Sequence, residues 1–300
     1  MDGIERVSPP TRGLRRVHGK GYFYRATFTS SNLCAPYTTA AHFGAATTEA
    51  VVRFSNGARA GAPDTAPGTH GMATRFRLAD GTSTDIVALN LPVFFAATPE
   101  DFLELIGLMP PAGESGAGDG AALGEYLAKH PRTAAFFRRT AALEPPASYG
   151  TSRYWAVHAF RWTGPDARIH HVRYRWEPAL GVRGLSDIGT EHTAPDYLDQ
   201  ELRWRVANGT VRFRLMIQFA GAEDPTDDST VEWPADRKEI DAGHLEIRQR
   251  ITGREAEELE RVVLDPNNLT PGIEASDDPI LEFRRPVYGE SRRRRIRERG

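Results

Sequence analysis

The feature that most constrains the fold is an alternation of two sets of residues at positions 210–219. Apolar side chains stand at every second position from Val211 to Phe219, and Arg212, Arg214, Met216 and Gln218 stand between them. A period of two predicts a β-strand whose two faces lie in different environments. Further runs with strand character lie at residues 50–57, 72–81, 84–95, 154–162, 167–176 and 244–251.

Helical segments separate the two groups of strands. Residues 98–109 begin with Thr98 as an N-cap and a proline at the first helical position. Helical character recurs at residues 120–131, 132–143, 194–209 and 253–264, whereas residues 1–45, 110–121 and 265–278 are rich in turn residues and predicted to be irregular. Strands and helices do not alternate regularly, which predicts an α+β fold with a mainly antiparallel sheet that closes into a barrel.

The charge balance and the cysteine content exclude several classes of protein. The 38 basic and 40 acidic residues give a net charge of −2, which argues against nucleic-acid and membrane-surface binding. The single cysteine, Cys34, cannot form an internal disulfide, so we expect a reducing, cytoplasmic location. No apolar run approaches the roughly 18–20 residues of a membrane span, and residues 1–20 lack the hydrophobic core of a secretory signal.

The arginine-rich C-terminal segment has two interpretations. Such a block is often a solvated, disordered or nucleic-acid-binding tail. In a helix, however, five residues would fall on one narrow stripe, namely Arg284, Tyr288, Arg292, Arg295 and Arg299. An adjacent guanidinium favours a phenolate, and tyrosine is a known proximal ligand of haem iron. The remaining arginines could pair with carboxylates such as haem propionates.

The residues before this helix resemble the haem catalases. Positions 265–276 are similar to the family's D-P-x-N-x-x-P-G-I-E-x-S, and R-x-x-x-Y follows at Arg284 and Tyr288. The resemblance implies that Tyr288 is the proximal iron ligand of a haem, with Arg284 beside it. Arg295 falls where the family places an arginine that binds a propionate.

Motifs in the N-terminal region agree with this resemblance. The run R-R-V-H-G-K-G at 15–21 is similar to the family's R-x-V-H-A-K-G, which implies that His18 is the distal acid and base. Arg15 then meets a propionate and Val17 contacts the haem. The run V-V-R-F-S at 51–55 resembles V-x-R-F-S, so Arg53 would meet a propionate and Ser55 would orient His18.

The run at 85–95 resembles the family's D-L-V-G-N-N-x-P-V-F-F but departs from it at one position. A gapless alignment puts Leu89 where the family has its distal asparagine, and Asn90 on the second asparagine. Asn90 is a candidate catalytic residue if the strand shifts, although a slip of one residue points it to the opposite face. By the same resemblance Phe94 lines the distal pocket. Phe102 either stacks on the haem or belongs to the core of its helix.

The resemblance extends over residues 11–296, because the strands at 154–160 and 211–219 also have counterparts in the family. It implies one catalase-like antiparallel β-barrel domain over residues 1–300, with inserted and C-terminal helices and with poorly ordered ends at 1–10 and 297–300. Full catalases are longer, with an N-terminal arm, a wrapping segment and C-terminal helices. The chain therefore resembles the short-chain branch, the catalase-related peroxidases or mini-catalases.

The resemblance leads to one expected function and two alternatives. We expect a haem b peroxidase that reduces hydrogen peroxide or an organic hydroperoxide with a small organic donor and has weak catalase activity. We expect the chain to form a homodimer. The first alternative is a rearrangement of fatty-acid hydroperoxides, as in allene oxide synthase-like relatives. The second is a barrel that binds haem or another hydrophobic ligand without catalysis.

Overall fold

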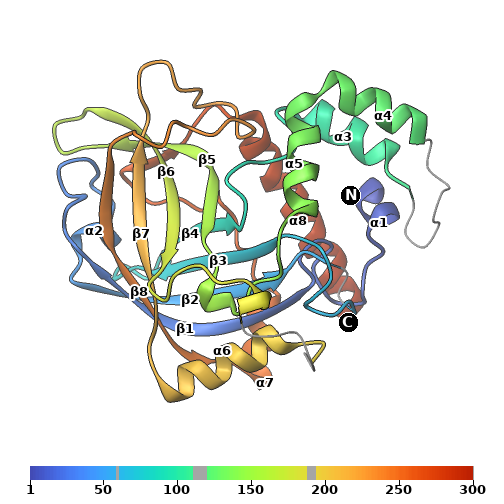
Figure 1. Ribbon diagram of the computed structural model, residues 1–300. Helices are drawn as coiled ribbons and strands as arrows, with labels where there is room; N and C mark the ends of the chain where they lie inside the picture. Colours follow the sequence, from blue (N-terminus) through green and yellow to red (C-terminus); the bar gives the residue numbers. More distant parts are fainter. Residues whose placement is uncertain (59–60, 111–119, 188–193, 300) are drawn as a thin grey trace.

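A nine-stranded antiparallel sheet that closes on itself forms the body of the molecule (Figure 1). The computed structural model describes residues 1–58, 61–110, 120–187 and 194–299. Neighbouring strands follow the order β4-β3-β2-β1-β8-β7-β6-β5-β9, and a β4–β5 pairing at Leu89 and Trp155 closes the barrel. The strands are β1 (Lys20–Ser30), β2 (Thr47–Asn56), β3 (His70–Arg77), β4 (Ser83–Leu89), β5 (Tyr154–Thr163), β6 (Ile169–Pro178), β7 (Val211–Phe219), β8 (Glu239–Arg250) and β9 (Ile273–Ala275). The predicted antiparallel barrel is confirmed.

Large apolar side chains fill the interior of the barrel. On β2, Phe54 is fully buried and its ring lies 6.0 Å from that of Phe213 on β7. The same core contains Met72 and Ala88, which pair across β3 and β4. Because side chains alternate along a strand, Arg53 and Ser55 lie on the outer face of β2. The barrel interior is thus a packed core, and its outer wall carries the polar residues singled out by the sequence.

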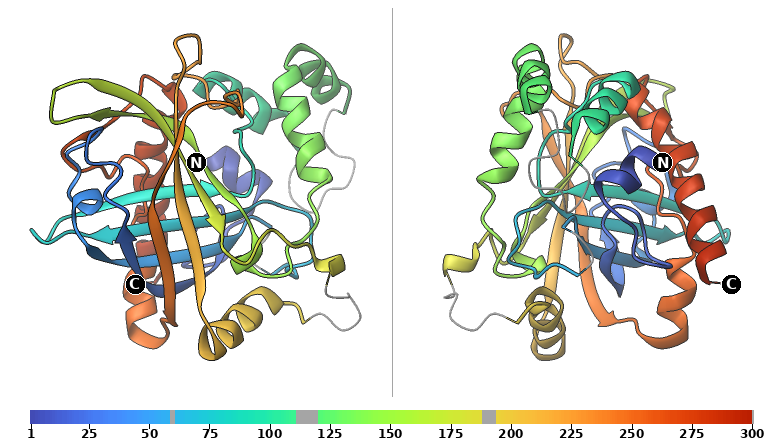
Figure 2. Two further views of the ribbon diagram at one scale, coloured as in Figure 1. Left: turned by 60° about the vertical axis from the view of Figure 1, so that its left-hand side comes forward. Right: turned by 90° about the vertical axis from the view of Figure 1, so that its right-hand side faces the viewer.

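Helices lie against one side of the barrel. The group α3 (Pro99–Leu108), α4 (Gly120–Lys129) and α5 (Pro131–Ala141) stands beside it, and α8 (Pro279–Arg299) runs along the same side (Figure 2). The short helix α1 (Asp2–Val7) contacts α3 and lies next to α8. Elsewhere the chain forms α2 (Ala41–Gly44), α6 (Tyr197–Asn208), which packs on β8, and α7 (Gly253–Glu260).

The start of α3 follows the predicted capping pattern. Thr98 is the N-cap, and its hydroxyl accepts a hydrogen bond from the backbone N–H of Asp101 at 3.1 Å. Pro99 is the first helical residue, where the missing N–H costs no hydrogen bond. The Gly-rich loop predicted at residues 110–121 lies mostly outside the described residues.

Two irregular segments of the sequence analysis contain strands instead. Residues 20–30, inside the stretch predicted to be irregular, form β1, which pairs with both β2 and β8. The pattern is weak because threonines and Ala26 stand among the aromatic residues, and only Tyr24, Ala26 and Phe28 show the buried alternation. Within residues 265–278, β9 pairs with β5 over three residues.

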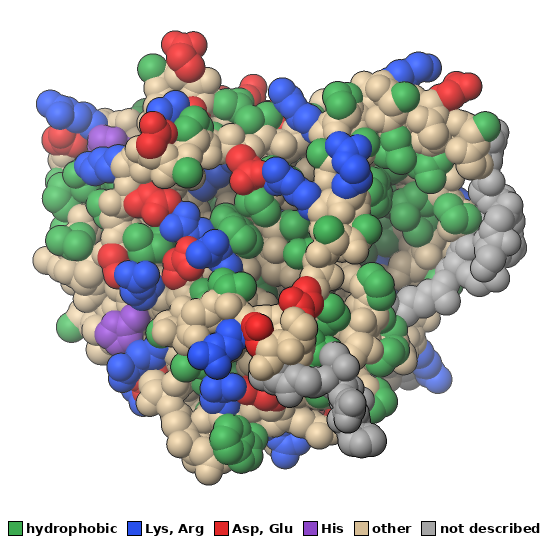
Figure 3. Space-filling view, in the orientation of Figure 1, with side chains coloured by type: hydrophobic (Ala, Val, Ile, Leu, Met, Phe, Trp, Pro, Cys, Tyr) green, Lys and Arg blue, Asp and Glu red, His purple; other side chains and the backbone are tan. Residues whose placement is uncertain are grey.

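Both chain ends contain helical residues. Residues 2–7, which were predicted to belong to a poorly ordered end, form α1, and α8 continues to Arg299. On the face drawn in Figure 3, acidic and basic side chains are interspersed over the barrel. No helix in the described ranges is long and apolar enough to cross a membrane.

Candidate active site

His18 lies against the outer face of β2 and β3. Its backbone has a φ of 55°, in the left-handed region, and its Nδ1 lies 3.1 Å from the hydroxyl of Ser55. Gly71 on β3 makes room for the ring, because a Cβ at that position would lie 2.8 Å from Ser55 Oγ and 3.2 Å from His18 Nδ1. Arg53 donates to the carbonyls of His18 at 3.0 Å and Gly19 at 3.2 Å. Residues of β2 therefore hold both the strained backbone and the side chain of His18 in place.

The His18 ring is neutral at physiological pH. Burial lowers its pKa to about 3, and the positive charge of Arg53 adds to the effect, followed by His70 and Arg284. A neutral imidazole can accept a proton at the ring nitrogen that Ser55 does not contact. The ring is therefore able to act as a general base.

One row of paired residues across the barrel wall, here called the register row, shows which residue lies on the same face as Ser55. Gly21, Ser55, Gly71, Leu89 and Trp155 are successive partners across β1, β2, β3, β4 and β5. Directly opposed residues project to the same face, and Phe54, next to Ser55, faces the interior. Leu89 therefore lies on the outer face with Ser55.

Asn90 contacts a different histidine. Its side-chain oxygen accepts a hydrogen bond from the backbone N–H of His70 at 2.7 Å, and its amide nitrogen lies 3.5 Å from His70 Nδ1. The catalytic role of Asn90 stays a prediction, but among the described residues its side chain contacts His70 and not His18. The physical reason is the alternation of strand side chains, which gives the outward position to Leu89.

Three arginines predicted to bind propionates meet at one residue, Glu260. Arg15 forms an ion pair with Glu260 at the end of α7 and donates to the carbonyl of Val262 at 2.9 Å. Arg53 Nε lies 3.3 Å from the other carboxylate oxygen of Glu260. Arg295 on α8 is 4% exposed and donates to the Glu260 carbonyl at 3.4 Å. Three distant parts of the chain thus bring guanidinium groups together.

Tyr288 is held by a chain of polar contacts on α8 and β5. Arg284 donates to Tyr288 Oη from Nε at 3.0 Å and from a second guanidinium nitrogen. Arg284 also lies 2.8 Å from His158 Nε2, and His158 Nδ1 lies 2.7 Å from Asp278. Burial lowers the pKa of His158, with Asp278 acting in the opposite direction. Both donors therefore point at Tyr288 Oη, and the contacts of Arg284 with His158 and of His158 with Asp278 fix the guanidinium.

His158 and Asp278 were not among the predicted site residues. His158 stands in the run Y-W-A-V-H-A-F, which resembles a catalase strand, so the motif could have marked it. Asp278 closes the loop at 265–278 and accepts hydrogen bonds from the N–H groups of Ile280 at 2.9 Å and Leu281 at 3.3 Å. Its contact with a histidine 120 positions away depends on the folded barrel.

The apolar side chains predicted to contact the haem, namely Phe94, Phe102 and Val17, lie in separate parts of the site. Phe94 has its ring 6.3 Å from that of His158, which places it beside the Arg284 chain. The Phe102 ring lies 5.9 Å from that of Phe283 on α8 and also packs on Phe95. Val17 is 50% exposed although its neighbour Arg16 is buried, so an apolar surface is left open next to His18.

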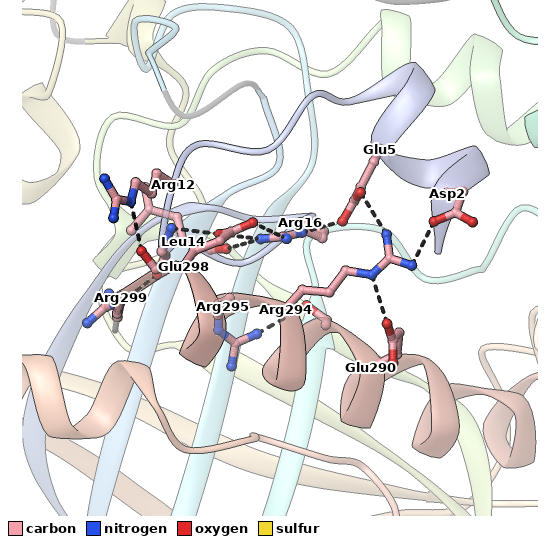
Figure 4. Close-up of polar contacts among 12 residues, drawn as sticks. Asp2, Glu5, Arg12, Leu14, Arg16, Glu290, Arg294, Arg295, Glu298 and Arg299 are labelled. Carbon is pink, nitrogen blue, oxygen red and sulfur yellow. Dashed lines mark hydrogen bonds and ion pairs between the residues drawn. The ribbon is translucent and has the colours of Figure 1, made fainter.

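Ion pairs of Arg16 and Arg294 tie α8 to the N-terminal segment (Figure 4). Arg16 binds Glu5 of α1 at 2.6 Å and Glu298 of α8 at 2.5 Å. Arg294 binds Glu5 at 2.8 Å and Asp2 at 2.6 Å. The segment that carries His18 is thereby fastened to the helix that carries Tyr288.

The comparisons with known proteins agree with this geometry. The sequence pattern that defines the catalase family matches residues 10–299. A protein named catalase-related peroxidase from Mycolicibacterium paratuberculosis is 37% identical over 97% of this chain and 92% of its own length. One with the same name from Synechococcus elongatus is 30% identical over 99% of this chain and 88% of its own length.

The fold is also that of solved catalases. A bacterial catalase superposes with a TM-score of 0.81 at 25% identity, over 95% of this chain and 58% of the other. A fungal catalase gives the same TM-score at 23% identity. This chain therefore belongs to the catalase family, whose members bind haem through a tyrosine and act on peroxide.

The residues present fit a haem. Arg15 and Arg53 pair with the Glu260 carboxylate, and Arg295 donates to the backbone carbonyl of the same residue. Arg295 Nε is buried without a hydrogen-bond partner among the described residues. Burial lowers the pKa of Arg295 to about 10, and Glu260 opposes the shift only in part. A second anion would relieve this excess of positive charge. The exposed side chain of Val17 offers an apolar contact to a flat ring.

Proposed function

We propose that this protein is a haem b peroxidase that reduces hydrogen peroxide or an organic hydroperoxide with a small organic donor. The two relatives named catalase-related peroxidase support peroxide as the substrate. The observation that carries the proposal is the register row in which Leu89, and not an amide, shares the outer face with Ser55. When bound, haem would supply the redox chemistry, held by Tyr288 and by Arg15, Arg53 and Arg295.

His18 is the proposed acid and base of the reaction. The Ser55 hydroxyl, 3.1 Å from Nδ1, orients the ring and leaves the other nitrogen for peroxide. The neutral ring takes a proton from one peroxide oxygen and returns it to the leaving oxygen as water forms. Gly71 and Arg53 keep the ring and its backbone in place for both transfers.

Leu89 favours the peroxidase reaction over the catalase reaction. In a catalase reaction a second peroxide is the reductant, and a polar side chain beside the distal histidine helps to orient it. Leu89 cannot donate a hydrogen bond, so a second peroxide is oriented only by His18. An organic donor that gives up electrons at the haem edge does not need this orientation.

The test compares oxygen release with donor oxidation. Haem-loaded protein is mixed with hydrogen peroxide in a stopped-flow instrument, with and without a phenolic donor. We expect consumption of peroxide that depends on the donor and little release of oxygen. Vigorous oxygen release without a donor, at rates typical of catalases, would contradict the proposal.

Two substitutions sharpen this test. Leu89→Asn places an amide in the row with Ser55 and should raise oxygen release at the expense of donor oxidation. Asn90→Ala removes the amide that contacts His70 and should leave the ratio of the two activities unchanged. If Asn90→Ala alone changes this ratio, Asn90 acts at the distal site and our assignment of Leu89 is wrong.

The apolar Leu89 also supports a second candidate function, the rearrangement of a fatty-acid hydroperoxide. This reaction needs no reductant, since the substrate supplies both the oxygen and the electrons. Incubation of the haem-loaded protein with a lipid hydroperoxide in the absence of a donor separates the two functions. A rearranged product favours this candidate, and turnover only in the presence of a donor favours the peroxidase.

A further inference from the structure

A groove of about 670 Å³ lies between α6 and β8, and we call it the α6–β8 groove. In Figure 1, α6 lies below the barrel, whereas α8, which carries Tyr288, runs along its side. The groove is therefore separate from the candidate active site, and its volume suits a small organic molecule. The long side chains that line it are those of Gln200, Arg203, Trp204, Arg248, Gln249 and Arg250.

One wall of the groove is apolar and flat. The Trp204 side chain is 64% exposed, and an indole of this size is rarely left open to solvent. Val206 and Ala207 of the same helix extend the apolar surface. Because aromatic rings pack well face to face with an offset, this wall is suited to a planar ring.

The rest of the lining has an excess of positive charge. It contains three arginines and, among the described residues, no aspartate or glutamate. Arg248 pairs with Glu246, but Glu246 also pairs with Arg212 at 2.8 Å, so two guanidinium groups share one carboxylate. Arg203 is exposed and forms no ion pair within the described ranges. These four residues carry a net charge of +2, from +3 and −1, which favours a further anion beside Glu246.

The third arginine is fixed in place. Arg250 Nε donates to the buried carboxylate of Asp199 at 2.8 Å, and the guanidinium lies 4.7 Å from the ring centroid of Tyr22. Asp199 is itself held by the hydroxyl of Tyr24 at 2.8 Å. The inner end of the groove is therefore anchored to the barrel core, and it stays in place while Arg203 and Arg248 adjust to a ligand.

We propose that the α6–β8 groove binds a planar aromatic carboxylate, with its ring against Trp204 and its carboxylate accepting hydrogen bonds from Arg203 and Arg248. Arginine forks match the geometry of a carboxylate, and the ligand adds to the existing ion pairs without replacing them. An extended polyanion such as a nucleic acid fits less well, because Asp196 contacts Gln200 and Glu246 contacts Arg248. This site does not depend on the proposed haem function.

The test measures the binding of 1-naphthoate by isothermal titration calorimetry. Haem-loaded protein is used, so that the arginines of the haem site are not free for the probe. Trp204→Ala should weaken binding by about tenfold or more because the stacking surface is lost, and Arg203→Gln by roughly two- to fivefold. The matched control is Arg205→Gln on the same helix, which pairs with Glu201 outside the groove and should leave binding unchanged.

Either of two results with these variants would overturn the proposal. Unchanged binding in Trp204→Ala would place the probe elsewhere on the protein. Equal weakening by Arg203→Gln and Arg205→Gln would mean that only the overall charge of the protein matters. Trp204 and Arg203 are exposed, so both variants should fold like the parent, which urea unfolding checks.

Two further probes test the class of ligand. The neutral 1-naphthalenemethanol and the non-aromatic cyclohexanecarboxylate each lack one of the two groups that the groove recognises, so each should bind about tenfold more weakly than 1-naphthoate. Equal binding of either probe would overturn the assigned class. Binding of a single-stranded oligodeoxythymidine in preference to 1-naphthoate would do the same. So would a dimer that Trp204→Ala dissociates, detected by sedimentation, since the groove would then be a subunit interface.

Discussion

At the scale of single residues, the distal side depends on close packing around His18. The ring, the Ser55 hydroxyl and the backbone of Gly71 share a space that leaves no room for a further carbon atom. The left-handed backbone at His18 is held by two hydrogen bonds from Arg53. Since burial and the neighbouring positive charges lower the pKa of His18 to about 3, the ring is neutral over the whole physiological range of pH, as the proposed base requires.

Gly71→Ala tests this packing. The new Cβ would meet Ser55 Oγ at 2.8 Å and His18 Nδ1 at 3.2 Å, so the ring has to move. We expect a fall in the rate of peroxide consumption of roughly tenfold or more, with a loss of about 1–3 kcal/mol in the free energy of unfolding. Stopped-flow kinetics and urea unfolding measure the two effects. Gly124→Ala on α4, where a Cβ meets nothing within 4 Å, is the control, and equal effects of the two substitutions would refute the packing argument.

At the scale of secondary-structure elements, α8 contributes to both sides of the site. Its first half carries Arg284 and Tyr288, whose orientation depends on His158 of β5 and on Asp278 just before the helix. Its second half carries Arg294 and Glu298, which bind the N-terminal segment. The helix therefore links the proposed iron ligand to the segment that delivers His18.

Asp278→Asn tests the chain of contacts behind Tyr288. The asparagine can still accept hydrogen bonds from the start of α8, but it removes the negative charge beside His158. We expect His158 to hold Arg284 less firmly, with a shift of the Soret band and faster loss of haem. Optical spectra of the loaded variant measure the first effect. A spectrum and a rate of haem loss identical to those of the parent would show that the chain does not act on Tyr288.

Arg16→Gln tests the link between the N-terminal segment and α8. Arg16 is 5% exposed and joins Glu5 to Glu298, so its loss leaves two carboxylates without their shared partner. We expect a loss of about 2 kcal/mol in the free energy of unfolding. Arg254→Gln, which breaks an exposed pair with Glu258 on α7, should cost well under that. Urea unfolding of both variants measures the two losses. Equal losses of free energy of unfolding would contradict the role of Arg16 as the link between the N-terminal segment and α8.

The barrel could be predicted from the sequence, and so could many residues of the candidate site, because both leave local signals. The alternation in β7 and the motifs around His18, Ser55 and Tyr288 are readable within short segments. The central role of β1 was missed because its small polar residues blur the alternation. The partners Glu260 and Asp278 were also missed, since each meets its arginine or histidine only through the closure of the barrel and the packing of α7 and α8 on it.

At the scale of the whole molecule, the packed barrel buries several histidines in neutral form. Burial lowers the pKa of His42 to about 3 and that of His70 to about 4, and for His70 Asp64 opposes the shift. Together with His18, three imidazoles in the folded protein bind protons far less readily than in the unfolded chain, where the pKa of histidine is 6.5. Acid should therefore favour the unfolded state.

This argument predicts the pH dependence of stability. As the pH falls from 6.5 towards 4, the unfolded chain gains protons that the folded protein does not, so the free energy of unfolding decreases. Each such histidine contributes a slope of at most about 1.4 kcal/mol per pH unit. Urea unfolding between pH 4 and 7 measures how the free energy of unfolding changes with pH. The substitution His42→Asn should reduce this slope. The same slope in the variant would show that His42 is not charged on unfolding in this range.

The most direct test of the central claim, a haem bound through Tyr288, is the optical spectrum of the haem-loaded protein and of Tyr288→Phe. We predict a Soret band in the parent that is shifted or abolished in the variant, because phenylalanine cannot bind iron. Tyr126→Phe on α4, whose hydroxyl donates to the carbonyl of Asp101, should leave the band unchanged. A parent without a Soret band, or an unchanged spectrum in Tyr288→Phe, would contradict the account.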